Sequence, residues 1–217
     1  MLSAVEPIKK GILVSPDPLL SCSAKTALGA AYFLEGNMEE AEKNWVEVCK
    51  YCEEHGAGTV GALSRTALNS LFIVKGELDR GVKMAEELIG WHKENESKWR
   101  LAYHLCWLGN VYLRMAQRKG STNFSILARN LGFFMRNILV AGSKAEDYLK
   151  KSVEVASQIG AMGLLGQASL GLGLLYVTRG RTDKSRQYIL EAIEAFQKCG
   201  AEAYLKQARE ALATSVA

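Results

Sequence analysis

The chain has 217 residues, of which 48% are hydrophobic and 23% are charged, so it can bury a substantial core and is not a disordered chain. Its net charge of +4 is mild and gives no reason to expect nucleic acid as a partner. No apolar run approaches the roughly 20 residues of a membrane-spanning helix, and five cysteines without framework spacing suit a reducing compartment. We therefore expect a cytoplasmic protein.

The first 18 residues differ from the rest because they contain all three prolines, Pro7, Pro16 and Pro18. Proline interrupts helix interiors, so the chain is free to be helical from residue 19 to its end. We interpret residues 1–18 as the remnant of a preceding helix followed by a linker; an irregular N-terminal arm is the alternative. The segment lacks the features of a signal peptide.

An internal repeat follows. Three segments starting at residues 27, 67 and 171 align without gaps, and each has a leucine, a small or polar residue, an aromatic residue and a glycine at fixed spacing. These positions are Leu28, Gly29, Tyr32 and Gly36; Leu68, Asn69, Phe72 and Gly76; and Leu172, Gly173, Tyr176 and Gly180. A fourth copy begins with Leu108, Gly109 and Tyr112.

The spacing of the leucines locates an insertion. Leu28, Leu68 and Leu108 follow one another at intervals of 40 residues, whereas Leu172 lies 64 residues after Leu108. The second half of the third copy resumes at Ala145 and Leu149, so about 24 residues are inserted between its halves. We predict repeats over 19–56, 59–95, 98–160 (with the insertion at 117–140) and 163–199, within a repeat region of 19–200, followed by a capping helix and tail at 201–217.

Each copy has the pattern of a helix–turn–helix unit. The small residues at 29, 109 and 173 let the two helices approach closely, and Gly36, Gly76 and Gly180 end the first helix, where a left-handed residue is needed. Residues 37–40 (NMEE) and 143–146 (SKAE) have the spacing of capping boxes at the start of the second helix. One such hairpin cannot bury its apolar face alone, so stacking of copies is expected.

This pattern resembles the tetratricopeptide repeat (TPR). The resemblance implies an all-α fold: a right-handed superhelical α-solenoid of about four repeats, with an inserted helix within the third and a C-terminal capping helix. The 40-residue period exceeds the usual 34, and the customary proline at the end of the second helix is absent. The segment IEAFQKCGAEAYLKQAREAL and the end of the insertion are also similar to the TPR region of large bacterial adenylate/guanylate cyclases that carry a signalling-ATPase module.

No constellation of residues indicates catalysis. Cys49, Cys52 and His55 lie roughly on one helical side, but a zinc site needs a further ligand or an open water position, and no second Cys/His pair is near in sequence. Core cysteines are the simpler interpretation. The motifs of cyclases and ATPases are absent from this chain, so we expect no enzyme activity, no metal and no cofactor.

The expected function is a non-catalytic protein–protein interaction scaffold, the regulatory TPR region of a bacterial multidomain signalling protein. Its partner would be a protein, a peptide or another domain of the same parent chain; the alternative is a small-molecule sensor whose groove binds an effector. In a TPR array the first helices line the concave groove, and any of these residues could instead serve ordinary packing. The predicted groove residues are Phe33, Thr66, Ser70, Ile73, Tyr103, Asn110, Leu113, Arg114, Gln167, Leu170 and Leu174.

The insertion predicts a helix over residues 121–140 with an apolar stripe at helical spacing. The stripe consists of Phe124, Leu127, Leu131, Phe134 and Ile138. We expect it to be buried, with Arg129 and Arg136 in solvent, because so apolar a helix would associate if exposed. Packing on its own array, on a second copy as a homodimer, or on a partner all remain open. A membrane surface is not expected, since two arginines make a weak polar face for lipid.

Overall fold

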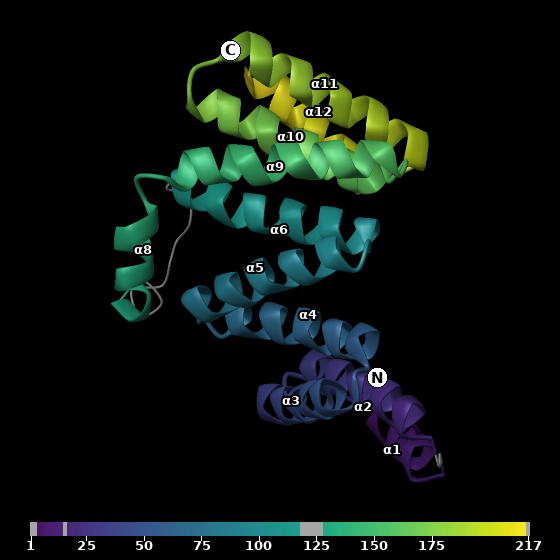
Figure 1. Ribbon diagram of the computed structural model, residues 1–217. Coiled ribbons are helices and arrows are strands. Elements are labelled where there is room, and N and C mark those ends of the chain that lie inside the picture. The colour runs from purple at the N-terminus through teal and green to yellow at the C-terminus, as the bar shows by residue number, and fades with distance from the viewer. Residues whose placement is uncertain (1–3, 15–16, 118–127, 216–217) are drawn as a thin grey trace. The chain divides into compact units, whose positions relative to one another are not determined.

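The computed structural model describes residues 4–14, 17–117 and 128–215, and within these ranges every regular element is a helix (Figure 1). The all-α prediction is confirmed for them. The helices are α1 (Val5–Val14), α2 (Pro18–Leu34), α3 (Met38–His55), α4 (Gly58–Val74), α5 (Leu78–Glu94), α6 (Lys98–Ala116), α8 (Leu131–Asn137), α9 (Ala141–Gln158), α10 (Met162–Thr178), α11 (Thr182–Cys199) and α12 (Glu202–Ser215). None of the helices in the described ranges is long and apolar enough to cross a bilayer.

Two compact units divide the chain, Met1–Leu88 and Ile89–Ala217, and the division falls inside α5. We call them unit 1 and unit 2 and describe each by itself. Apart from the stretches on either side of α8, the helices from α2 onward are joined by only two or three residues. Gly36, Gly76 and Gly180 lie in these turns with φ values of 83°, 74° and 65°, which confirms the left-handed conformation predicted for them.

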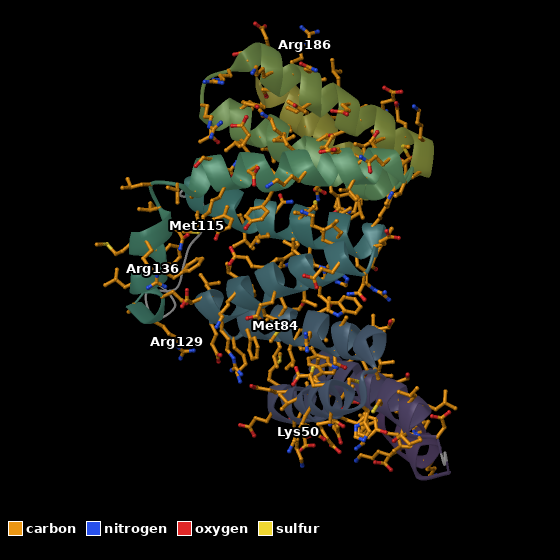
Figure 2. The ribbon with its side chains drawn as sticks, in the orientation of Figure 1. Lys50, Met84, Met115, Arg129, Arg136 and Arg186 are labelled. Atoms are coloured by element: carbon orange, nitrogen blue, oxygen red, sulfur yellow. The ribbon has the colours of Figure 1, made fainter. Side chains whose placement is uncertain are left out.

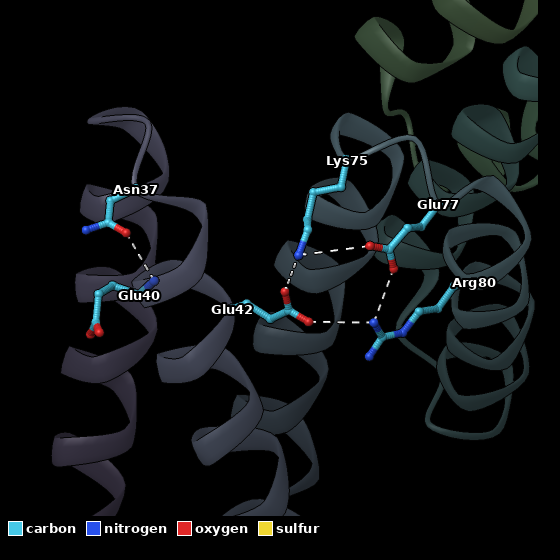
Figure 3. Close-up of polar contacts among 6 residues, drawn as sticks. All are labelled: Asn37, Glu40, Glu42, Lys75, Glu77 and Arg80. Carbon is cyan, nitrogen blue, oxygen red and sulfur yellow. Dashed lines mark hydrogen bonds and ion pairs between the residues drawn. The ribbon is translucent and has the colours of Figure 1, made fainter. Parts of the chain in front are cut away.

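In unit 1, α1 packs on α2, α2 on α3, and α3 on α4. The sequence starts these helices with recognisable caps. Pro18 opens α2 directly after Asp17, whose carboxylate accepts hydrogen bonds from the backbone N–H groups of Leu19 and Leu20. At the start of α3, the Asn37 side chain accepts a 3.2 Å hydrogen bond from the Glu40 N–H, as the capping-box motif predicts (Figure 3).

Four charged side chains connect α3 to the α4–α5 turn in unit 1 (Figure 3). Lys75 lies 2.6 Å from Glu42 and 3.9 Å from Glu77, and Arg80 lies 3.6 Å from Glu42 and 3.2 Å from Glu77. The Arg80 guanidinium also stands 3.7 Å above the Phe72 ring. Single exposed ion pairs contribute only about 0–1 kcal/mol, but a closed network with a cation–π contact orients the turn more firmly than one pair would.

The close helix approach expected at positions 29, 109 and 173 is present in both units. A Cβ added at Gly29 would lie 2.5 Å from the Trp45 indole nitrogen. In unit 2, one added at Gly109 would lie 2.7 Å from Leu149 Cγ, and one at Gly173 would lie 2.5 Å from Ile189 Cγ1. Each glycine therefore meets the bulky residue at the same register of the following long helix, and any side chain there would push the helices apart.

Unit 2 is built around α6, α9, α10 and α11, each packed on the next, with α6 also touching α10. Its core includes the fully buried Leu149, Leu172 and Ile189. The hydroxyl of Ser152 donates a 2.9 Å hydrogen bond from α9 to the Ala102 carbonyl of α6. Helix α12 covers the last apolar face, burying Leu205 and Ala208 against α11.

The insertion differs from its prediction. Helix α6 ends at Ala116 and α9 begins at Ala141, but between them the described helix α8 covers only seven residues, with turns at Asn130 and at 138–140. The prediction of a continuous helix over 121–140 is therefore wrong for its described part. Phe124 and Leu127 lie outside the described residues.

The predicted buried stripe is also wrong at both of its described ends. Leu131 is 56% exposed and Ile138 is 39% exposed, and Phe134 is half-buried, whereas Phe133 and Asn137 are buried. The physical reason is polar anchoring. Asn137 donates a hydrogen bond to the Phe133 carbonyl, and its side-chain oxygen accepts one from Lys144 at 3.0 Å, which holds this side of α8 inward. Arg129 and Arg136 are exposed, as expected.

The second predicted capping box is not formed. Because α9 already begins at Ala141, Ser143 lies in its first turn and its hydroxyl donates to the Val140 carbonyl. Glu146, the last residue of the motif, serves a different purpose. Its carboxylate accepts hydrogen bonds from Lys150 at 2.6 Å, from the Tyr176 hydroxyl at 2.7 Å and from Arg179.

Candidate binding site

A hollow of about 520 Å³ lies within unit 2, between one face of α6, one face of α10 and the side of α12. Its walls are formed by residues at helical spacing on α6 and α10, and by two residues of α12. The lining residues are Tyr103, Cys106, Trp107, Asn110, Leu113, Arg114 and Gln117; Leu164, Gln167, Leu170, Gly171 and Leu174; and Tyr204 and Gln207.

The hollow exists because the opposite faces of its two walls are used for packing. Gly109 and Tyr112 turn one side of α6 towards α9, with Tyr112 stacked on Tyr148 at 5.8 Å. On α10, Gly173 faces Ile189, and a Cβ added at Gly166 would lie 2.5 Å from the Phe196 ring. The remaining faces of α6 and α10 carry larger and more polar side chains, and these surround the hollow.

All seven groove residues predicted within unit 2 line this hollow. They are Tyr103, Asn110, Leu113, Arg114, Gln167, Leu170 and Leu174. Their common placement follows from the 64-residue offset between the two copies, which puts equivalent faces of α6 and α10 on the same side.

The four predicted groove residues of unit 1 are engaged in local contacts. Phe33 packs on Trp45 with ring centroids 6.0 Å apart, and Ile73 fills the space beside Gly81. Thr66 and Ser70 donate their hydroxyl hydrogen bonds to carbonyls one turn earlier, those of Ala62 and Thr66. All four are half-buried, and none lines the hollow of unit 2.

Asn110 is held at the floor of the hollow. Its amide nitrogen donates to the Cys106 carbonyl at 2.9 Å and approaches the Cys106 sulfur at 3.5 Å. A Cβ added at Gly171 would lie 3.3 Å from the Asn110 side-chain oxygen, so the absence of a side chain at Gly171 leaves room for that oxygen between α6 and α10. The amide is therefore fixed in orientation before any ligand arrives.

The hollow is polar in character but carries only one formal charge. Arg114 is exposed at its edge, and no Asp or Glu belongs to the lining. Burial raises the pKa of the Cys106 thiol to about 12 and also raises the pKa of Tyr103, so both groups are neutral near pH 7. Amides of Asn110, Gln117, Gln167 and Gln207 supply most of the hydrogen-bonding capacity.

Sequence reasoning missed part of the lining. Tyr204 and Gln207 belong to α12, which was predicted only as a cap; Tyr204 stacks on Phe196 at 5.4 Å and faces the hollow with its outer side. Trp107 and Gln117 continue the α6 face by one helical step and could have been found from that spacing. The residues of α12 could not, because their position depends on how far α12 folds back across α10.

The cysteine and histidine residues form no metal site among the described residues. Cys49 points to the Gly61 carbonyl, and His55 stacks on Tyr51 with ring centroids 4.0 Å apart. His92 and His104 stack on each other at 5.0 Å in unit 2, fully buried. Burial and the neighbouring His104 lower the pKa of His92 to about 4, so this pair is a neutral packing element at neutral pH.

Comparisons with known proteins support the fold and do not name a family. The chain matches no protein-family model, and no curated protein is similar to it in sequence. Among solved structures it is similar to the crystal structure of BtubC (BKLC) from P. vanneervenii, with a TM-score of 0.59 and 15% sequence identity. The similarity covers 97% of this chain and 87% of that chain, and at this identity it concerns the fold alone.

Proposed function

We propose that the chain is a non-catalytic protein-interaction scaffold made of TPR-like repeats in a right-handed superhelix, and that the hollow of unit 2 binds an extended segment of a partner protein. The repeated register of Gly29 with Trp45, Gly109 with Leu149 and Gly173 with Ile189 supports the repeat architecture. The observation that carries the binding proposal is the acid-free, amide-lined hollow between α6, α10 and α12.

The chemistry of the lining suits a peptide backbone. An extended segment presents N–H and C=O groups in alternation, and carboxamide side chains can donate to one and accept from the other. Asn110 and Gln167 face each other from α6 and α10, and Leu113, Leu170 and Leu174 offer apolar surface for the side chains of the segment. Arg114 at the edge favours a segment that carries an acidic group.

Selection of random peptides against the purified chain, followed by fluorescence anisotropy on the enriched sequences, tests the proposal. Asn110→Ala combined with Gln167→Ala should weaken binding of the selected peptides about tenfold or more, since two amide contacts are lost. Gln187→Ala, an exposed glutamine on α11 outside the hollow, is the matched control and should change nothing. Enriched peptides that bind the double variant as well as the original chain would contradict this site.

A small-molecule effector is the second candidate for the same hollow, because about 520 Å³ lies within the roughly 300–1,000 Å³ typical of ligand pockets. Thermal-shift screening with a metabolite collection separates the two candidates. A compound that raises the melting temperature of the original chain, and not that of the Asn110→Ala and Gln167→Ala variant, would favour the sensor.

The proposal extends to a parent protein. Residues 193–212 are similar to the end of the TPR region in bacterial nucleotide cyclases with a signalling-ATPase module, and this similarity is the support for a regulatory role in such a protein. The length of the native open reading frame tests it directly. A frame without a cyclase or ATPase domain, in a gene neighbourhood without one, would remove this part of the proposal.

A further inference from the structure

An exposed apolar surface lies on α8 and the turn that follows it. Met135 is 72% exposed and Leu139 is 93% exposed, and Leu131, Ile138 and Val140 are exposed beside them. We call these five residues the α8 patch. A contiguous group of large apolar side chains in water marks an interaction surface rather than ordinary surface variation.

The patch projects from unit 2 instead of lining a cavity. Helix α8 lies beyond the ends of α6 and α9, outside the layers that α6, α9 and α10 form (Figure 1). Its inward side is anchored by Asn137, which bonds to Lys144 at the start of α9. The anchored side and the exposed side together make a short amphipathic element with a fixed outward face, unlike the concave site that a bound peptide or helix would need.

The sequence around the patch has a strong charge asymmetry. Residues 97–145 contain eight Lys and Arg and no Asp or Glu. Because the whole chain has 27 Lys and Arg against 23 Asp and Glu, the remainder holds 19 against 23. The chain is therefore slightly acidic overall except for one basic stretch, and that stretch includes the α8 patch.

We propose that the α8 patch attaches the protein to the surface of an anionic lipid bilayer. The exposed apolar side chains would enter the interface between headgroups and acyl chains, and the basic stretch would be attracted by the negative surface potential. Arg129 and Arg136, exposed on the same segment (Figure 2), also have contacts within the chain. Attraction to a charged surface requires only a local excess of positive charge and no unpaired arginine.

The structure removes the reason for which the sequence excluded a membrane. That exclusion assumed that the apolar stripe of the insertion was buried against protein and that two arginines were its only cationic residues. The exposure of Met135 and Leu139, and the absence of any acid from residue 97 to residue 145, change both premises. This inference concerns a different surface from the hollow of unit 2 and does not depend on the proposed function.

Vesicle co-sedimentation of the full chain tests the proposal. We expect binding to phosphatidylcholine vesicles that contain about one-third phosphatidylserine and little binding to phosphatidylcholine alone. Binding should fall steeply between about 0.1 M and about 1 M salt, where the Debye length shrinks from about 10 Å to about 3 Å. No binding to the anionic vesicles at low salt would overturn the proposal.

Paired variants separate the patch from general charge effects. Met135→Glu combined with Leu139→Glu should reduce binding to the anionic vesicles about tenfold or more, because two apolar side chains are lost from the interface and two negative charges appear. Leu34→Glu combined with Val74→Glu makes the same change at two exposed positions in unit 1 and should retain much more binding. All four positions are exposed, so circular dichroism and melting temperature should show that both variants fold.

Two results would assign the patch to something else and refute the lipid proposal. Equal losses in the two double variants would show that net charge alone governs binding. A chain that ignores vesicles but self-associates, and becomes monomeric in sedimentation when Met135 and Leu139 are changed, would show that the patch binds a second copy. A hollow of about 260 Å³ beside Ile138 and Leu139 would then be the place for a side chain of that copy.

Discussion

Glu96 has a backbone conformation that glycine has at the equivalent positions of the chain. Its φ is 51°, and Gly56, Gly160 and Gly200, which also follow long helices, have φ values of 68°, 66° and 66°. A non-glycine residue in this region costs about 1–2 kcal/mol, part of which glycine loses again to backbone entropy. We expect Glu96→Gly to raise the free energy of unfolding by up to about 1 kcal/mol in urea titration.

A matched control makes this test specific to conformation. Glu154 is exposed in the middle of α9, in the same unit, where the backbone is helical. Glu154→Gly should therefore lower stability by about 1 kcal/mol. If both substitutions lowered stability equally, strain at Glu96 would not be the cause.

The buried pair His92 and His104 predicts a loss of stability in mild acid. Burial, His104 and Arg100 lower the pKa of His92 to about 4, below its ordinary value of 6.5. The unfolded chain therefore binds the extra proton first, so the stability that the neutral ring provides is present above pH 6.5 and is lost as pH falls towards 4. The loss amounts to about 3 kcal/mol, since each pKa unit corresponds to about 1.4 kcal/mol.

Urea unfolding between pH 7.5 and pH 4.5 measures this loss, and His92→Phe should flatten the pH dependence. Burial lowers the pKa of His104 as well, so part of the slope should persist in that variant. His55→Phe, at an exposed ring on α3, is the control. A slope unchanged by His92→Phe would show that other groups control the acid response.

At the scale of single elements, Glu146 fastens α9 to α10. Partial burial alone would raise the pKa of Glu146, but hydrogen bonds from Lys150, Arg179 and Tyr176 lower it to about 2. The stabilisation is therefore present above about pH 4.5 and is lost as pH falls towards 2. Allowing for partial solvent screening, Glu146→Gln should cost about 2 kcal/mol at pH 7, measured by urea unfolding.

Asp147 supplies the comparison for that change. It is the next residue of α9, and its ion pair with Lys151 at 2.6 Å is more than half exposed on both sides. Asp147→Asn should cost less than about 0.5 kcal/mol, because an exposed i, i+4 pair contributes little. Equal effects at Glu146 and Asp147 would show that the contacts to α10 add nothing.

The regular helices could be predicted from the sequence because their signals are local. Glycine at 36, 76 and 180 needs a left-handed φ, and small residues at 29, 109 and 173 must meet a larger side chain across the pair. The insertion could not be predicted in the same way. Its apolar residues allow several helical faces, and the face that is buried is selected by Asn137, whose partner Lys144 belongs to another helix.

At the scale of the whole molecule, the sequence located one side of the candidate site and missed the other. The 40-residue period placed Tyr103, Asn110 and Gln167 on equivalent faces, and these residues do line one hollow. Periodicity carries no information on where the array stops, so the contribution of Tyr204 and Gln207 depended on the packing of α12. The division of the chain inside α5 also has no sequence signal, since α5 is an ordinary uninterrupted helix.

That division predicts how the chain unfolds. Packing is concentrated within Met1–Leu88 and within Ile89–Ala217, so a destabilising change in one unit should affect that unit first. Tryptophans allow the two to be observed separately, because Trp45 is buried in unit 1 whereas Trp91, Trp99 and Trp107 lie in unit 2. A variant with phenylalanine at the latter three positions reports unit 1 by fluorescence, and circular dichroism reports the whole chain.

In that single-tryptophan variant we expect Glu146→Gln to lower the urea midpoint seen by circular dichroism and to leave the Trp45 midpoint nearly unchanged. The same background without Glu146→Gln is the reference, so any weakening by the phenylalanine substitutions cancels. The reverse change, Gly29→Val, should lower the Trp45 midpoint because the added side chain meets the indole ring, at a cost of about 1–3 kcal/mol. If either substitution shifted both midpoints equally, the chain would unfold as one cooperative block and the two units would have no separate stability.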